Sequence, residues 1–238
     1  MSFYIFGLKK NLKPLILFFD EVDGLIEDSL IAFLKQIRTG YTKRPHKFPQ
    51  SICLIGVRDL RDYKLKSIDD IESGILLSPF NIKAESLKLV DFSLDQVREL
   101  YLQHSQETGQ IFTDDAIEYA YYITAGQPWL VNAIAYEACF RDLLDRTKLI
   151  TKEVMERAKE KIITRQDTHL DALLDRLNES RVRKIIDAII SGSSELLNIS
   201  ADDLQYVRDL GLIKQDSLEI ANPIIRNYFI IKETIQIL

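Results

Sequence analysis

Two unbroken apolar runs stand out in the first part of the chain, Pro14–Phe19 and Ser51–Val57. A run that is apolar throughout, rather than at every second position, is typical of a strand buried on both faces of a parallel sheet. Between them, Ile26–Arg38 repeats apolar residues at helical spacing, and Gly40 is expected to end that helix. The strand–helix–strand order predicts a parallel crossover unit, with a third strand expected over residues 82–92.

From Leu94 onward the apolar spacing is helical. We expect helices near residues 94–107, 113–124, 127–145, 151–164, 169–177, 179–191 and 201–210, and a last helix opened by Pro223. Short apolar pieces at 212–213 and 218–220 predict a small hairpin before that last helix. The pattern therefore divides the chain into residues 1–92, a helical bundle over 93–165 and a C-terminal module over 166–238.

Composition narrows the class of protein. The 238 residues are 28% charged and 46% hydrophobic, which excludes collagen-like, low-complexity and disordered chains. No apolar run approaches the roughly 20 residues that a membrane helix needs, and the N-terminus lacks a secretory pattern. A cytoplasmic protein is therefore expected. Cys53 and Cys139 lie in apolar surroundings and are expected to be buried free thiols.

The charge balance argues against a broad nucleic-acid surface. Lys and Arg number 31 against 36 Asp and Glu, which gives a net charge of -5. Residues 168–238 carry 8 basic and 11 acidic side chains, and their excess of acids repels phosphates. Only the basic loop over residues 41–50 could touch nucleic acid, although such a loop is more often simply solvated. We therefore do not expect nucleic acid as a partner.

The first apolar run ends in two adjacent acids, Asp20 and Glu21. In open α/β sheets, ligands bind at the carboxyl ends of the strands. One carboxylate there can hold Mg²⁺ on a triphosphate, and its neighbour can orient and deprotonate an attacking water. Alternatively, both acids merely favour the N-terminus of the helix that follows, although Asp23 and Gly24 could serve that purpose themselves.

These residues resemble the Walker B segment of P-loop ATPases of the AAA+ and STAND groups. Those ATPases place a polar sensor, often arginine in the STAND branch, at the end of the next strand, where this chain has Arg58. The resemblance implies that Asp20 binds Mg²⁺, that Glu21 is catalytic and that Arg58 contacts the γ-phosphate of ATP. An ion pair of Arg58 with Asp59 or Asp62 is the simpler alternative.

A second matching motif is Gly126-Gln127-Pro128. It resembles the Gly-x-Pro with which STAND and archaeal-type ATPases begin a helix after the sheet, and this implies that Gly126 and Pro128 lie near the adenine. Helix punctuation explains the same residues, because glycine ends helices and proline opens them. The C-terminal module resembles a winged helix. The resemblance thus implies an α/β core with a partial parallel P-loop-type sheet, then an all-α helical bundle and a winged-helix-like end.

A P-loop of the form Gly-x-x-x-x-Gly-Lys-Ser/Thr is absent from the sequence. Since the P-loop strand and its helix precede Walker B and only 13 residues precede Pro14, the chain is expected to be the C-terminal part of an ATPase. Three explanations for the missing P-loop are open: a truncated or split gene, a misassigned start codon, or a partner subunit that supplies the phosphate cradle. Any ATP hydrolysis would then require the upstream P-loop.

The sequence therefore favours an ATP-binding, ATPase-like regulatory protein with ATP and Mg²⁺ as cofactors. The alternative is a non-catalytic interaction module that retains the ATPase fold, followed by a DNA-binding winged-helix protein. Expected partners are nucleotide, if a P-loop is supplied, and a protein partner or a second copy of the chain. No membrane association is expected.

Overall fold

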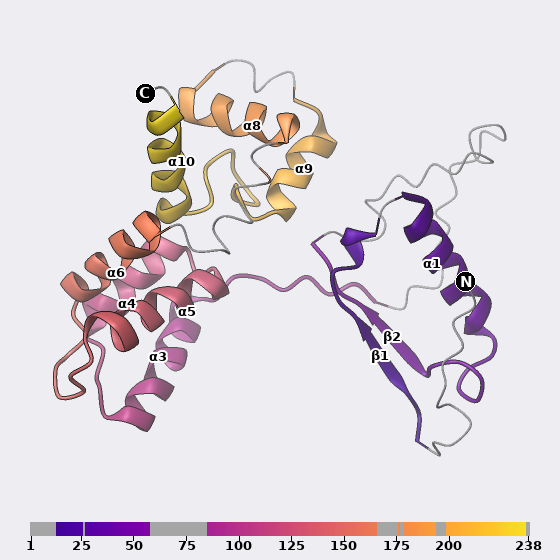
Figure 1. The fold of residues 1–238 in the computed structure, drawn as a ribbon, viewed down its shortest axis with the longest axis horizontal. Coiled ribbons are helices and arrows are strands. Elements are labelled where there is room, and N and C mark those ends of the chain that lie inside the picture. Colours follow the sequence, from indigo (N-terminus) through magenta and orange to yellow (C-terminus); the bar gives the residue numbers. More distant parts are fainter. Residues whose placement is uncertain are drawn as a thin grey trace. The chain divides into compact units, whose positions relative to one another are not determined.

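The computed structural model describes residues 13–25, 27–57, 85–165, 176, 179–193 and 199–236. The chain forms two compact units, residues 1–88 and 89–238, each of which is described by itself (Figure 1). The first unit holds a pair of strands and one long helix, and the second is helical. The expected boundary between bundle and C-terminal module stays a prediction, because residues 166–175 lie outside the described part.

Strands β1 (Ile16–Phe19) and β2 (Ser51–Leu54) pair in parallel. The register sets Ile16 opposite Ser51 and Phe19 opposite Leu54. Helix α1 (Glu27–Tyr41) connects the two strands, so the strand–helix–strand unit expected from the apolar pattern is present. Because the strands are parallel, both carboxyl ends lie at the same edge of the pair, and the chain leaves both strands there.

Helix α1 covers one face of the strand pair. Leu30 and Leu34 of the helix form a small buried cluster with Val22, against which Phe19, Phe33 and Leu54 pack. The rings of Phe19 and Phe33 meet edge to face, with centroids 5.0 Å apart. Side chains of a strand alternate between faces, so the residues between these point to the other side of the sheet.

The other face of the strand pair is bare among the described residues. Ile16 is 53% exposed and Phe18 is 69% exposed, and Cys53, which lies opposite Phe18, is exposed as well. The expectation that these strands are buried on both faces is therefore wrong for the described part of the chain, as is the expectation of a buried thiol at Cys53. An apolar run shows only that both faces of a strand can be buried. Burial of the second face requires a further helix or strand that packs against it.

Two further expectations for the first part of the chain are corrected. Gly40 does not end α1, which continues to Tyr41, and a Cβ at Gly40 would overlap the ring of Phe48. Close packing of an aromatic ring, and not a helix stop, is what requires glycine there. The strand expected over 82–92 is absent from residues 85–92, where Leu87 and Leu89 are more than four-fifths exposed, and residues 82–84 lie outside the described part.

The second unit consists of helices close to the predicted positions. They are α3 (Leu94–Thr108), α4 (Asp114–Thr124), α5 (Pro128–Glu137), the π-helix η3 (Ala138–Asp142), α6 (Lys152–Arg165), α8 (Ser180–Ser191), α9 (Ala201–Asp209) and α10 (Pro223–Gln236). The helix expected near 169–177 lies outside the described residues except for Arg176. None of the described helices is both long and apolar enough to cross a membrane.

One apolar core runs through the whole second unit. Its buried residues extend from Val97 in α3 to Phe229 in α10, and α10 packs against both α4 and α6. The expected hairpin is reduced to a single antiparallel bridge between Ile213 and Ile220. The order of helices and hairpin is compatible with a winged helix, and that classification of the C-terminal module stays a prediction.

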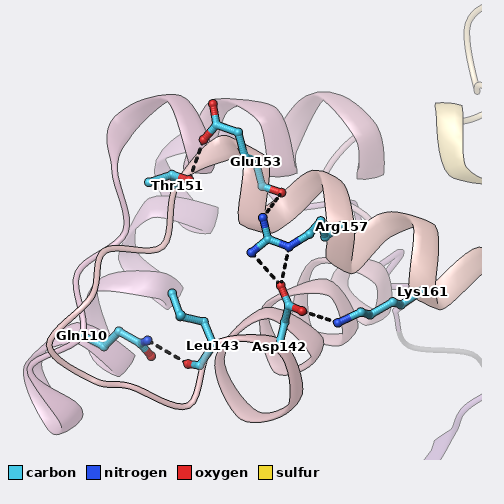
Figure 2. Close-up of polar contacts among 7 residues, drawn as sticks. All are labelled: Gln110, Asp142, Leu143, Thr151, Glu153, Arg157 and Lys161. Carbon is cyan, nitrogen blue, oxygen red and sulfur yellow. Dashed lines mark hydrogen bonds and ion pairs between the residues drawn. The ribbon is translucent and has the colours of Figure 1, made fainter.

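A polar network fixes the end of η3 against α6 (Figure 2). The carboxylate of Asp142, only 11% exposed, accepts a hydrogen bond from Arg157 Nε at 3.0 Å and also pairs with Lys161. Burial alone would raise the pKa of Asp142, but the hydrogen bonds and charges of Lys161 and Arg157 together lower it. Buried Gln110 donates to the carbonyl of Leu143 at 3.1 Å, which secures the chain that follows (Figure 2).

Candidate functional site

The turn after β1 carries the two acids predicted to form the site. Asp20 and Glu21 are both exposed, and the backbone N–H of Glu21 donates to Asp20 Oδ1 at 2.9 Å. Glu21 has a φ of 54°, a left-handed conformation that costs a non-glycine residue of order 1 kcal/mol. A short 3₁₀ turn, Val22–Gly24, follows at once. Such backbone strain concentrates at functional sites, so the turn is a candidate for one.

The acidic turn is tied to the segment that leaves β2. The N–H of Val22 donates to the carbonyl of Ile55 at 3.1 Å, and the N–H of Val57 donates to Asp23 Oδ1 at 3.2 Å. A Cβ on Gly56 would lie 2.6 Å from that same Asp23 oxygen, so glycine is needed there. The ends of the two strands are thus held together at one edge of the sheet.

Asp23 is a residue whose role the sequence did not reveal. It could be considered only as a cap of the following helix, whereas its carboxylate instead accepts the N–H of Val57. The next residue is Arg58, the predicted sensor, which lies outside the described residues. The available signal was the third acid following Asp20 and Glu21, together with a glycine near the end of the second apolar run.

The acidic turn fits a magnesium ion that is shared with a phosphate ligand. One oxygen of Asp20 is engaged by the N–H of Glu21, and the exposed carboxylate retains further acceptor positions. Among the described residues, no three His, Cys, Asp or Glu side chains gather as a metal site. Mg²⁺ is commonly held by one or two carboxylates plus substrate phosphates, and this donor set suits that arrangement.

The Gly126-Gln127-Pro128 turn lies between α4 and α5 in the second unit. Gly126 has a φ of 79°, and a Cβ there would overlap the carbonyl oxygen of Phe92. The N–H of Phe92 donates to the carbonyl of Gly126 at 2.8 Å, so the chain that enters the second unit runs along this turn. Pro128 occupies the first turn of α5 and is exposed. Packing and helix punctuation therefore suffice to explain Gly126 and Pro128.

The side chain between them has an unusual environment. The oxygen Oε1 of Gln127 is buried and has no hydrogen-bond partner within the described part of the chain. Buried side-chain acceptors are normally paired, so an unpaired one calls for a water or ligand that donates a hydrogen bond. Sequence reasoning treated Gln127 only as the variable position of the motif.

The five predicted site residues fall into three groups. Asp20 and Glu21 lie in the first unit, Gly126 and Pro128 lie in the second, and Arg58 lies outside the described residues. The first two are brought together with Asp23 and the end of β2. Their assignment to nucleotide and metal stays a prediction.

Among the solved structures that are similar to this chain are two structures of the RuvB protein from Thermotoga maritima. One, a K64R mutant, is 17% identical, with a TM-score of 0.44 over 91% of this chain and 69% of that chain. The other, described as a Holliday junction branch migration motor, is 18% identical, with a TM-score of 0.45 and the same coverage. No curated protein matches the chain significantly.

A comparison with protein families covers almost the whole sequence. The family described as the AAA-like domain matches residues 2–230, which include the acidic turn, the basic loop and the Gly-x-Pro turn. This match confirms the broader part of the resemblance, a P-loop ATPase-type family, and leaves the STAND subgroup as a prediction. The chain belongs to the AAA-like domain family.

Proposed function

We propose that the chain is the Walker B and lid part of a STAND-like AAA+ ATPase and that it serves as an ATP-dependent regulatory switch. The observation that carries the proposal is the strained acidic turn after β1, tied to the end of β2 through Asp23 and Val57. Membership of the AAA-like domain family supports it. A protein partner or a second copy of the chain would receive the signal, through the helical bundle or the C-terminal module.

Each predicted residue has a distinct role in this proposal. Asp20 would hold Mg²⁺, Glu21 would orient and deprotonate the attacking water, and Arg58 would contact the γ-phosphate. Bound Mg²⁺ supplies charge that neutralises the phosphate oxygens of ATP. Asp20 and Glu21 are both exposed, so both carboxylates are accessible to a ligand.

The Gly126-Gln127-Pro128 turn would contact the adenine. Support comes from the buried, unpaired acceptor Gln127 Oε1, because the exocyclic amino group of adenine is a hydrogen-bond donor. Guanine has an acceptor at the corresponding position, so Gln127 would favour ATP over GTP. Exchanging Gln127 for Met removes the acceptor at similar length and should lower ATP affinity while leaving GTP affinity little changed.

The proposal includes a P-loop contributed by sequence outside these 238 residues, since none of the nine glycines begins one. Backbone N–H groups of a P-loop supply most contacts to the phosphates. We therefore expect weak nucleotide binding by the chain alone and hydrolysis only when the phosphate cradle is supplied.

Nucleotide binding by the chain itself is the first test. Thermal unfolding is followed with and without ATP and Mg²⁺, because a ligand at 100 times its Kd stabilises the fold by about 2.7 kcal/mol. ATP and Mg²⁺ should raise the unfolding temperature of the unchanged chain and of the control Asp216→Ala, which lies in an exposed part of the hairpin. Loss of this rise in Asp20→Ala supports the metal role of Asp20. A shift that both variants retain contradicts that role.

Turnover is tested in a longer protein that includes a P-loop. Glu21→Gln should abolish ATP hydrolysis while ATP binding is retained, because the amide cannot accept the proton of the attacking water. Glu99→Gln, at an exposed position of α3, is the matched control and should hydrolyse ATP normally. Unchanged turnover in Glu21→Gln would remove its catalytic assignment and favour the non-catalytic interaction module instead.

A further inference from the structure

A stretch of the first unit is strongly basic in a chain that is acidic overall. Residues 29–57 contain five lysines and arginines and no aspartate or glutamate, although the whole chain has a net charge of -5. Four of these cations, Lys35, Arg38, Lys43 and Lys47, are exposed, and we refer to them together as the basic face. They lie at the C-terminal end of α1 and in the loop that leads to β2 (Figure 1).

The backbone places these cations in two pairs. Lys35 and Arg38 are three residues apart on α1, a spacing that sets side chains on the same side of a helix. After α1 the chain continues as tight turns, in which the N–H of Lys43 donates to Gly40 at 2.9 Å and that of Lys47 donates to Lys43 at 3.0 Å. Lys43 and Lys47 are thus one turn apart in a loop of defined shape.

Arg44, the fifth cation, holds that loop in place. Its guanidinium stacks on the ring of Tyr41 at 3.8 Å and donates to two backbone carbonyls, that of Tyr41 at 3.3 Å and that of Gln50 at 3.0 Å. Below the loop, the ring of Phe48 packs against Gly40. A loop fixed in this way presents its lysines with little further ordering, which reduces the entropic cost of binding.

The cations of the basic face have no anionic side chain as a partner among the described residues. None of the four has an ion pair or a side-chain hydrogen bond in the described part of the chain. In the second unit, by contrast, cations such as Arg157 and Lys161 are paired with carboxylates. The like charges of these cations repel one another, and an anionic partner relieves this repulsion.

The surroundings favour one class of anionic partner. Among the described residues 29–50, Tyr41 is the only exposed large hydrophobic side chain, whereas the centre of a protein–protein interface is rich in apolar and aromatic residues. A membrane-binding surface would place several apolar side chains beside its cations, whereas among these residues only the large apolar side chain of Tyr41 is exposed and Arg44 stacks on its ring. Cations together with hydroxyls such as Thr42 suit phosphates of a nucleic-acid backbone.

We propose that the basic face binds the phosphate backbone of nucleic acid without reading its base sequence. The sequence had left this loop as the only stretch that could touch nucleic acid and favoured a solvated loop, and the proposal takes the other of these two alternatives. The proposal does not depend on ATP binding by Asp20 and Glu21, whose turn follows β1 at the carboxyl end of the strands, whereas the basic loop precedes the amino end of β2.

Fluorescence anisotropy of the 238-residue chain with a labelled DNA duplex and a labelled single strand tests the proposal. With four phosphate contacts, affinity for the duplex should fall about 100-fold between 50 and 200 mM salt, because log affinity falls with log salt at about 0.9 per contact. The double variant Lys43→Gln/Lys47→Gln keeps two contacts, and its affinity should fall only about 10-fold over the same range.

A matched control removes the same charge elsewhere. Lys184→Gln/Arg226→Gln neutralises two exposed cations of α8 and α10 and should bind DNA like the unchanged chain. Absence of binding at 50 mM salt, or an equal loss in both double variants, would overturn the proposal. Tighter binding to poly-glutamate or to phosphatidylserine vesicles than to DNA would overturn it too, in favour of a protein or a membrane partner. ATP-dependent thermal shifts should be the same in both double variants.

Discussion

The two units of this protein differ in how their main apolar elements are enclosed and in how their cations are paired. The second unit encloses one core from Val97 to Phe229 and pairs the half-buried Asp142 with two cations. The first unit has one covered sheet face, a second face with Phe18 69% exposed, and four cations without a partner among the described residues. The first unit therefore exposes both apolar side chains and cations that have no partner among the described residues.

This difference teaches where the functions of the protein are to be sought. Groups that are enclosed or paired inside a unit contribute to its stability, whereas exposed apolar patches and clustered cations mark surfaces that meet other molecules. The acidic turn, the bare sheet face and the basic face all belong to the first unit. The second unit is built around one continuous apolar core.

The largest expected effect concerns the turn at Gly126, which contacts Phe92 near the start of the second unit. Gly126→Ala should lower the free energy of unfolding by about 3 kcal/mol or more, because it adds an overlap with the Phe92 carbonyl to an unfavourable backbone conformation. Gly109→Ala, with a similar φ of 77° and open space, should cost only about 1 kcal/mol. Urea unfolding followed by the fluorescence of Trp129, the sole tryptophan, measures both. Equal losses would show that the Phe92 contact contributes little.

A second prediction compares one apolar residue from each unit. Leu130→Ala, at a fully buried position of α5, should destabilise the second unit by about 3 kcal/mol through the cavity it leaves. Phe18→Ala, on the bare sheet face, should change the stability of the first unit by less than about 0.5 kcal/mol. Amide hydrogen exchange resolves the two units. A large loss with Phe18→Ala would mean that another element covers this face.

The third prediction uses the polar network of Figure 2. Since the pKa of Asp142 is lowered in the folded state, its carboxylate stabilises the fold at neutral pH, and this contribution should be lost as the pH falls below about 4. Asp142→Asn should cost about 1–2 kcal/mol at pH 7 and flatten the acid side of the stability profile. Asp187→Asn, in an exposed pair with Arg183, should cost at most about 0.5 kcal/mol. Urea unfolding at pH 3 to 7 provides the comparison.

The smallest effect is one of reactivity without loss of stability. Cys53 should react with a thiol reagent in the folded chain, since it lies on the bare sheet face. Cys139 should react only after unfolding, because it is 1% exposed and burial raises the pKa of its thiol to about 11. Mass spectrometry counts the labelled cysteines. Protection of Cys53 in a longer protein, with labelling in this chain, would identify a segment that covers the sheet.

Much of the fold could be predicted because its signals are local. The helices α3, α4 and α8 begin and end within a few residues of the predicted positions, and α10 begins at the predicted Pro223, since apolar periodicity, caps and prolines act over one or two turns. The acidic turn could be located for the same reason, as a polar stop to an apolar strand. Its role as a Walker B segment stays a prediction.

The tertiary structure decided what depends on contacts between distant residues. The apolar sequence of a strand indicates that the strand can be buried. Only the packing of α1 shows which face is covered and why Cys53 is exposed. Likewise, Asp23 meets Val57 and Gly126 meets Phe92 only after the chain has folded, because 34 residues separate each pair. Sequence alone determined most of the helices, the strand–helix–strand unit and the position of the acidic turn, whose chemistry stays a prediction. The three-dimensional arrangement decided which side chains are buried or paired and which remain exposed. Burial and pairing depend on neighbours in space, and these neighbours are often distant in the sequence.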